Sequence, residues 1–174
     1  MVLIKLTSQA INCFFCVSGK TLTTITVLHS AMTCPELVSA TGKPFFHKCL
    51  IIVPTNTLTN WETEILKWTE PLQNPLTVHN LGKFHPSYRL TEVGNWKNRG
   101  GLLLVGDMLF QKMCDDILKI AQPDILVLDE AHTMLKSTST KVSKKLQQIR
   151  TKRRILLTGT PLQNNVTEYF HMVE

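Results

Sequence analysis

The chain has 174 residues, of which 43% are hydrophobic and 18% charged, and it carries a net charge of +6. This length favours one domain with one substantial core over a two-lobed enzyme. No apolar run approaches the roughly 20 residues needed to cross a bilayer, and the first 20 residues lack the basic head of a signal peptide, so we expect no membrane association. The cysteines are odd in number and lack a second pair at zinc spacing, which predicts reduced thiols. They stand at positions 13, 16, 34, 49 and 114.

Four continuous aliphatic runs predict strands that are buried on both faces, because they lack the polar alternation of half-exposed strands. They span residues 48–53, 101–105, 124–128 and 154–158. Such strands are typical of a parallel sheet that helices cover on both sides. Strands that alternate with helices predict an α/β fold with right-handed crossovers.

Helices are expected between these strands. One should span residues 22–32, and two others follow from apolar residues at i, i+4 and i+7. Those residues are Trp61, Ile65 and Trp68 in one helix and Val142, Leu146 and Ile149 in the other, which Thr138 or Ser139 could cap. The stretch from 69 to 98, rich in Pro, Asn and Gly, is expected to hold a weak strand at 76–80 and surface loop.

The first motif with a chemical meaning is Gly19-Lys20-Thr21, ahead of the helix expected at 22–32. The N–H groups at a helix start favour phosphate, a lysine can reach the β- and γ-phosphates, and a threonine hydroxyl can hold Mg²⁺. The full pattern GxxxxGK[ST] needs a glycine where Phe14 stands. Taken alone, the tripeptide is therefore more simply explained by chance.

The second motif, Asp129-Glu130-Ala131-His132, follows the aliphatic run at 125–128. At the carboxyl edge of a parallel sheet, such an Asp can hold Mg²⁺ and the next Glu can orient the water that attacks a γ-phosphate. Taken alone, the pair is also what a helix start favours, since acidic residues there are stabilising.

The third motif runs from Leu157 to Asn165, again at the end of an aliphatic run. Its chemistry is that of a polar turn, with Gly-Thr-Pro as a chain breaker. Hydroxyls and amides here could relay the state of a nucleotide site to a nucleic-acid surface.

Read in order, SGKT, VPTNTLTNWETEILKW, LVLDEAH and RRILLTGTPLQNN resemble the first ATPase lobe of Swi/Snf-type remodelling ATPases, in helicase superfamily two. Within this family they are similar to the ATRX-like branch and its DNA-repair translocase relatives. The resemblance covers residues 19–174 apart from the stretch 71–98. It implies a RecA-like, P-loop NTPase lobe with a DEAH box that uses ATP and Mg²⁺ to move along double-stranded DNA or chromatin in the nucleus.

The resemblance also assigns roles to residues of this sequence. Gly19, Lys20 and Thr21 match the phosphate loop, with Thr21 and Asp129 on Mg²⁺ and Glu130 activating water. His132 and the coupling motif of Thr158, Gly159 and Thr160 would link the nucleotide to the DNA. Pro54, Thr55, Asn56 and Asn60 fall on the segment that lies near the DNA backbone in this family, although Asn60 could equally be a helix cap and Trp61 a core residue.

The chain also departs from the family pattern. Val17 replaces a glycine of the phosphate loop, residues 1–18 resemble nothing in the family, and Asp107-Met108 follows Gly106 where a Tyr-Glu pair is usual. The chain ends at Glu174, so we expect the second lobe, with the arginines that speed hydrolysis, to be absent. We accordingly expect weak nucleotide binding at best and negligible hydrolysis from these 174 residues.

Three interpretations therefore remain open at this stage. The chain is a fragment of a DNA-dependent ATPase, or it is a catalytically inactive lobe that binds DNA or a protein, or residues 1–18 derive from an incorrect gene model. The basic run from Lys136 to Arg154, with eight Lys or Arg and no acidic residue, fits a phosphate backbone. It equally fits a solvated helix face or a surface that meets another domain.

Overall fold

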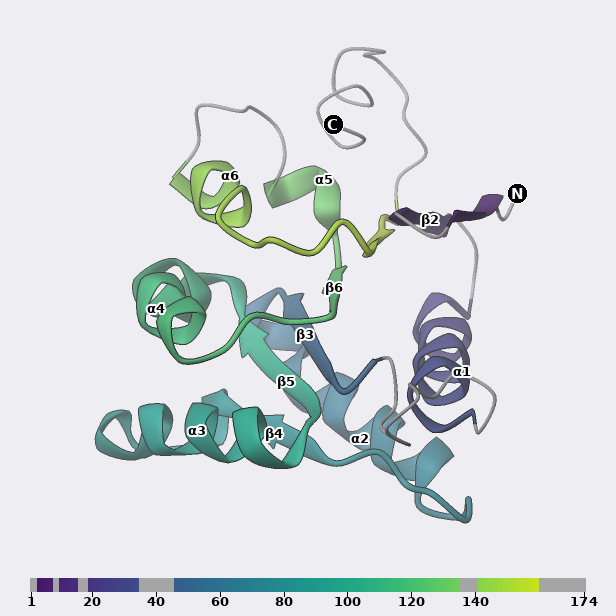
Figure 1. Cartoon of the computed structure of the whole chain (residues 1–174), viewed down its shortest axis with the longest axis horizontal. Coiled ribbons are helices and arrows are strands. Elements are labelled where there is room, and N and C mark those ends of the chain that lie inside the picture. Colours follow the sequence, from purple (N-terminus) through teal and green to yellow (C-terminus); the bar gives the residue numbers. More distant parts are fainter. Residues whose placement is uncertain (1–2, 8–9, 16–18, 35–45, 135–140, 160–174) are drawn as a thin grey trace.

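The computed structural model describes residues 3–7, 10–15, 19–34, 46–134 and 141–159 (Figure 1). Their strands form one seven-stranded sheet. All neighbouring strands in it are parallel except the first two, which form an antiparallel pair at one edge. The order across the sheet is β1 (Leu3–Thr7), β2 (Ala10–Phe15), β7 (Arg154–Leu157), β6 (Ile125–Leu128), β3 (Lys48–Val53), β5 (Gly101–Gly106) and β4 (Val78–Asn80).

Helices cover both faces of this sheet. In Figure 1, α1 lies to one side of the strands, and α3, α4 and α6 lie to the other. The helices are α1 (Lys20–Thr33), α2 (Leu58–Thr69), α3 (Arg89–Arg99), α4 (Asp107–Ile120), α5 (Ala131–Met134) and α6 (Lys141–Leu146). Three short 3₁₀ turns lie between strands and the helices that follow them. They are η1 (Thr55–Thr57) between β3 and α2, and η2 (Leu81–Lys83) and η3 (Pro86–Tyr88) between β4 and α3.

The core is accordingly divided into two layers by the sheet. Alternate residues of β3 face opposite layers, so that Leu50 and Ile52 pack with residues of α3, α4 and α6, while Ile51 and Val53 pack with residues of α1 and α2. The central strands are fully buried, which explains their unbroken aliphatic sequence. The predicted α/β fold, with a parallel sheet between two helical layers, is confirmed for the described residues.

Several local expectations were wrong. The stretch 69–98 is not mainly loop, because α3 occupies Arg89–Arg99 and the strand β4 is limited to Val78–Asn80. The helix expected around residues 142–149 ends at Leu146, although Ile149 is still buried. Trp68 does not join the buried stripe of α2 and is 41% exposed. Thr138 and Ser139 lie outside the described residues.

The parallel arrangement brings the carboxyl ends of the strands to one edge of the sheet. Ile52 of β3 pairs with Leu128 of β6, which pairs in turn with Leu156 of β7. The residues that follow these strands therefore emerge side by side. This edge is where ligands bind in open α/β sheets.

Candidate functional site

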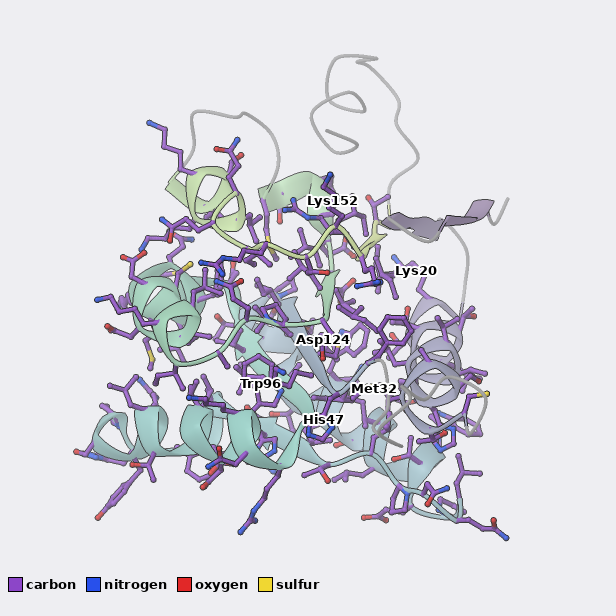
Figure 2. The ribbon with its side chains drawn as sticks, viewed as in Figure 1. Lys20, Met32, His47, Trp96, Asp124 and Lys152 are labelled. Atoms are coloured by element: carbon purple, nitrogen blue, oxygen red, sulfur yellow. The ribbon has the colours of Figure 1, made fainter. Side chains whose placement is uncertain are left out.

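The Gly19-Lys20-Thr21 motif lies at the start of α1. Gly19 is the N-cap of the helix and has a φ of 89°, in the left-handed region that glycine adopts at little cost. A Cβ at this position would meet none of the described residues within 4 Å, so they leave open space beside the turn. Lys20 and Thr21 follow in the first helical turn, and Figure 2 shows Lys20 at one end of α1.

Asp129 and Glu130 come directly after β6, at the carboxyl edge. The backbone N–H of Asp129 donates to the carbonyl of Ile52 on β3, over 2.9 Å, which fixes the residue against the sheet. Glu130 has a φ of 50°, a conformation that is costly for a residue with a side chain. Its backbone N–H donates to Oδ1 of Asp129 over 3.0 Å, which links the two acidic residues.

The Glu130 carboxylate is the centre of a polar cluster. Its Oε1 lies 3.8 Å from Nζ of Lys20, and its Oε2 accepts a hydrogen bond of 3.2 Å from the backbone N–H of Gly159. A Cβ on Gly159 would lie 3.2 Å from both Oε1 of Glu130 and Nζ of Lys20, so glycine permits this close approach. Residues from three separate motifs of the sequence thus meet around one carboxylate.

His132 joins this cluster to the end of β7. Its Nδ1 lies 2.9 Å from Oγ1 of Thr158 and 3.3 Å from Oε2 of Glu130. His132 therefore joins the acidic motif to the residue that follows β7. Thr160, the third residue of the expected coupling motif, lies outside the described residues.

The carboxylate of Asp129 is partly buried and hydrogen-bonded. Burial raises the pKa of its carboxyl above the ordinary value, while the hydrogen bond from Trp61, the N–H of Glu130 and the charge of Lys20 act in the opposite direction. The indole Nε1 of Trp61 donates to Oδ2 of Asp129 over 2.8 Å. Among the described residues, each oxygen of this half-buried carboxylate thus has one donor and keeps a further lone pair.

The segment expected near DNA follows the neighbouring strand β3. Thr55, Asn56 and Asn60 are exposed there, and Pro54 is partly exposed. Asn60 is the third residue of α2 and not its cap, which is Thr57. None of the hydrogen bonds or ion pairs among described residues joins these four side chains to Lys20 or Glu130.

This segment is tied to the start of α4 through Asp107. Both the backbone N–H and the hydroxyl of Thr55 donate to Oδ1 of Asp107, over 3.2 and 2.9 Å. A Cβ on Gly106 would come within 2.7 Å of the Thr55 hydroxyl, so a side chain there would disturb this contact. Asp107, the first residue of the departure noted above, therefore has a local structural role.

The basic run divides into structural and exposed members. Nζ of Lys145 lies 2.9 Å from Asp115, and the Arg154 guanidinium donates to backbone carbonyls at the end of α6. Arg153 lies over the ring of Phe46 at 5.0 Å. Lys144, Arg150 and Lys152 are exposed, so only part of the run is free to meet another molecule.

The residues present fit a magnesium-bound nucleotide better than a protein-only metal site. No group of three or more His, Cys, Asp or Glu in the described part of the chain could hold a metal ion. Mg²⁺ is usually held by one or two carboxylates together with substrate phosphates and water, and Asp129 could supply such a carboxylate. Cys34, Cys49 and Cys114 are free thiols and stand apart from this arrangement.

Sequence reasoning missed two residues of this region. Trp61 was expected only as a core residue, and it is one, at 1% exposure, but it also contacts Asp129. Asp107 was noted only as a departure. The signal available for Trp61 was its place directly after the segment 54–60.

Within the described residues, no helix is long and apolar enough to cross a membrane.

The chain is similar to several curated proteins over about nine-tenths of its length. It is 35% identical to Protein CHROMATIN REMODELING 20 of Arabidopsis thaliana over 171 residues, which are 90% of this chain and 11% of that protein. It is 34% identical to Transcriptional regulator ATRX of Homo sapiens over 172 residues, 89% of this chain and 7% of that protein. With DNA repair and recombination protein RAD54 of Oryza sativa subsp. japonica the identity is 32%, over 89% of this chain and 15% of that protein.

A solved structure has the same fold. The SWI2/SNF2 ATPase core of Sulfolobus solfataricus, determined in complex with dsDNA, matches with a TM-score of 0.70 and 27% identity, over 95% of this chain and 31% of that one. This similarity, with the parallel sheet described above, confirms a RecA-like fold. The chain thus spans less than a fifth of the curated relatives described above and about a third of this structure.

The family is shown by the sequence as a whole as well as by its motifs. The profile of the SNF2-related domain matches residues 2–174, a span that includes strands β1 and β2. The four motifs from which the resemblance was drawn lie within this span, and residues from three of them meet around the Glu130 carboxylate. The chain belongs to the SNF2-related domain family.

Proposed function

We propose that this chain is the ATP-binding first lobe of a DNA-dependent ATPase of the remodelling type. The observation that carries the proposal is the convergence of Lys20, Glu130 and Gly159 beside the open turn at Gly19. A lysine and a carboxylate beside the free N–H groups of a helix start are groups that phosphoryl transfer uses. In the complete protein, hydrolysis would drive movement along duplex DNA.

Each residue of the site would have a distinct part. The first-turn N–H groups after Gly19 and the ammonium of Lys20 would bind the phosphates, and Thr21 and Asp129 would hold Mg²⁺, which neutralises charge on the phosphates when bound. Glu130 would orient the attacking water and accept its proton. Removal of its charge should therefore affect turnover far more than binding.

The path from His132 to Thr158 would carry the state of the nucleotide to other parts of the protein. The 2.9 Å contact joins His132, two residues after Glu130, to Thr158, one residue before Gly159, so a change around the γ-phosphate would alter it. Thr160 is proposed to continue this path. Coupling of this kind is a free energy shared between the nucleotide and DNA sites.

Double-stranded DNA is the proposed partner, with Pro54, Thr55, Asn56 and Asn60 at its backbone. Three of these side chains are exposed at the same edge of the sheet as the nucleotide site. The exposed Lys144, Arg150 and Lys152 would add charge that favours phosphates. The Sulfolobus core was solved with dsDNA, and chromatin-related and DNA-repair relatives support the same partner and a nuclear location.

The experiment that tests the nucleotide site is a calorimetric titration of the 174-residue chain with MgATP, beside Lys20→Ala and Lys112→Ala. Lys112 is an exposed lysine of α4 and serves as the matched control for loss of one positive charge. Binding that is lost in Lys20→Ala and kept in Lys112→Ala would support the proposal. If the wild-type chain binds no MgATP, the proposal is wrong for this chain, and DNA or protein binding without turnover becomes the function to test.

A further inference from the structure

Two tryptophans of α2 each donate an indole N–H to a carboxylate, but their surroundings differ. Trp61 is 1% exposed and reaches across to Asp129 of the following motif, over 2.8 Å. Trp68, two turns along the helix, is 41% exposed and bonds Glu64 of its own helix over 2.7 Å. Only the first of these bonds therefore connects α2 to the edge of the sheet that carries the candidate site.

The bond from Trp61 settles the orientation of the Asp129 carboxylate. Oδ1 is held by the backbone N–H of Glu130, which can turn only with the chain, whereas Oδ2 is held by Trp61 alone among the described hydrogen bonds. A carboxylate with one fixed donor on each oxygen cannot rotate without losing a bond. Its remaining lone pairs consequently point in fixed directions, as a metal ligand requires.

Trp61 is itself held in place by the elements on either side. The next residue, Glu62, accepts hydrogen bonds from Asn80 Nδ2 over 2.7 Å and from Lys83 Nζ over 2.9 Å. At the start of the helix, the N–H and hydroxyl of Thr57 both donate to the carbonyl of Pro54 over 2.9 Å. The helix that carries the indole is thus anchored both to η2 and to the segment at residues 54–57.

We propose that Trp61 is a positioning residue for the metal-binding carboxylate of Asp129. The inference rests on the proposed nucleotide site and adds to it a residue that touches neither nucleotide nor metal. Removal of the indole N–H should lower the Mg²⁺-dependent part of ATP binding and leave the Mg²⁺-independent part unchanged.

The test compares ATP affinity with Mg²⁺ and with EDTA for the 174-residue chain and three variants. Trp61→Phe removes the N–H but also shrinks a buried ring, so Trp61→3-benzothienylalanine, which keeps the ring size and lacks the N–H, is measured beside it. Trp68→Phe is the matched control, because it removes an indole bond to a carboxylate on the same helix. Circular dichroism and thermal melts show which variants fold.

The expected result is a loss of about tenfold or more in the advantage that Mg²⁺ gives, since residues behind a metal ligand commonly contribute that much. The loss should occur in each Trp61 variant that folds, and it should not occur in Trp68→Phe. In spectra of ¹⁵N-labelled indoles, the signal of Trp61 should shift on addition of MgATP, while that of Trp68 should stay in place.

The other possible results distinguish failure of the proposed function from failure of the role proposed for Trp61. If the wild-type chain binds no ATP, the proposed function fails and this inference fails with it. If ATP binds but Mg²⁺ gives no advantage, the metal role of Asp129 is wrong and the inference falls while phosphate binding stands. Equal Mg²⁺ dependence in wild type and the benzothienyl variant, or an equal loss with EDTA, overturns the inference alone.

Discussion

Glu130→Gln should increase the affinity of the chain for ATP measured without Mg²⁺. The Glu130 carboxylate lies 3.8 Å from the Lys20 ammonium, where phosphates would have to compete for the same lysine. The amide of glutamine keeps an acceptor for the N–H of Gly159, so the backbone contact can persist. The substitution therefore changes the charge and little of the shape.

The size of the effect follows from the separation and the exposure of the pair. Two unit charges at this distance attract by about 1 kcal/mol in water and by about 4 kcal/mol in a protein-like surface environment. The side chains of Lys20 and Glu130 are 22% and 33% exposed, and partly exposed pairs are usually worth no more than about 1 kcal/mol. Release of the lysine should thus tighten ATP binding by about fivefold.

The assay is fluorescence titration with an ATP analogue in EDTA, at low and high salt. Glu64→Gln is the control, because Glu64 pairs with Lys67 at 3.7 Å on α2 and its loss changes the net charge equally. The gain should appear only in Glu130→Gln and should shrink as salt screens the pair. Unchanged or weaker binding by Glu130→Gln would show that Lys20 is not held by Glu130 in solution.

Two further predictions concern stability. Asp124→Ala should lower the free energy of unfolding in urea by about 2–3 kcal/mol, because one carboxylate oxygen of Asp124 accepts two backbone N–H bonds of 2.8 Å from His47 and Lys48, at the start of β3 (Figure 2). Asp116→Ala, at an exposed site, is the control and should change the free energy by less than about 0.5 kcal/mol. A change as small as this in Asp124→Ala would contradict the prediction. Asp129→Asn should be at least as stable as wild type at pH 7 without Mg²⁺. The raised pKa of Asp129 means that the folded chain binds the proton more tightly than the unfolded chain, so the charged form is destabilising at neutral pH. The free energy of unfolding of wild type should therefore rise relative to that of the variant as the pH falls. If acidification from pH 7 instead lowers the free energy of unfolding of wild type relative to that of Asp129→Asn, the direction of the pKa shift is wrong.

The sequence predicted the central strands well because their composition leaves few alternatives. Residues 48–53 and 101–105 are short, uninterrupted aliphatic runs, and both are strands that are buried on each face. The helix α3 was missed for the opposite reason. Of its eleven residues only Val93 and Trp96 are buried, and Gly94 stands between them, so there is no apolar stripe to detect.

The exposure of Trp68 could not be read from periodicity either. The spacing of Trp61, Ile65 and Trp68 fits one helix face, and the first two are buried. Whether the third is covered depends on how far neighbouring elements extend along the helix. The position of those elements is a property of the tertiary structure.

For the candidate site, the sequence by itself determined which groups are present and in which local setting. A Gly-Lys-Thr at a helix start, and carboxylates directly after a buried strand, follow from local propensity and strand burial. Their spacing along the chain, with Lys20 and Glu130 more than a hundred residues apart, gives no distance between them.

Only the tertiary structure decided which of these groups meet. The parallel register of β3, β6 and β7 places Asp129 and Thr158 at one edge of the sheet, where the cluster around Glu130 forms. The contact of Trp61 with Asp129 joins residues 68 positions apart, and no local pattern specifies it. Local sequence fixes the conformation of each segment, but contacts between segments depend on how buried surfaces pack, and that packing is a property of the whole chain.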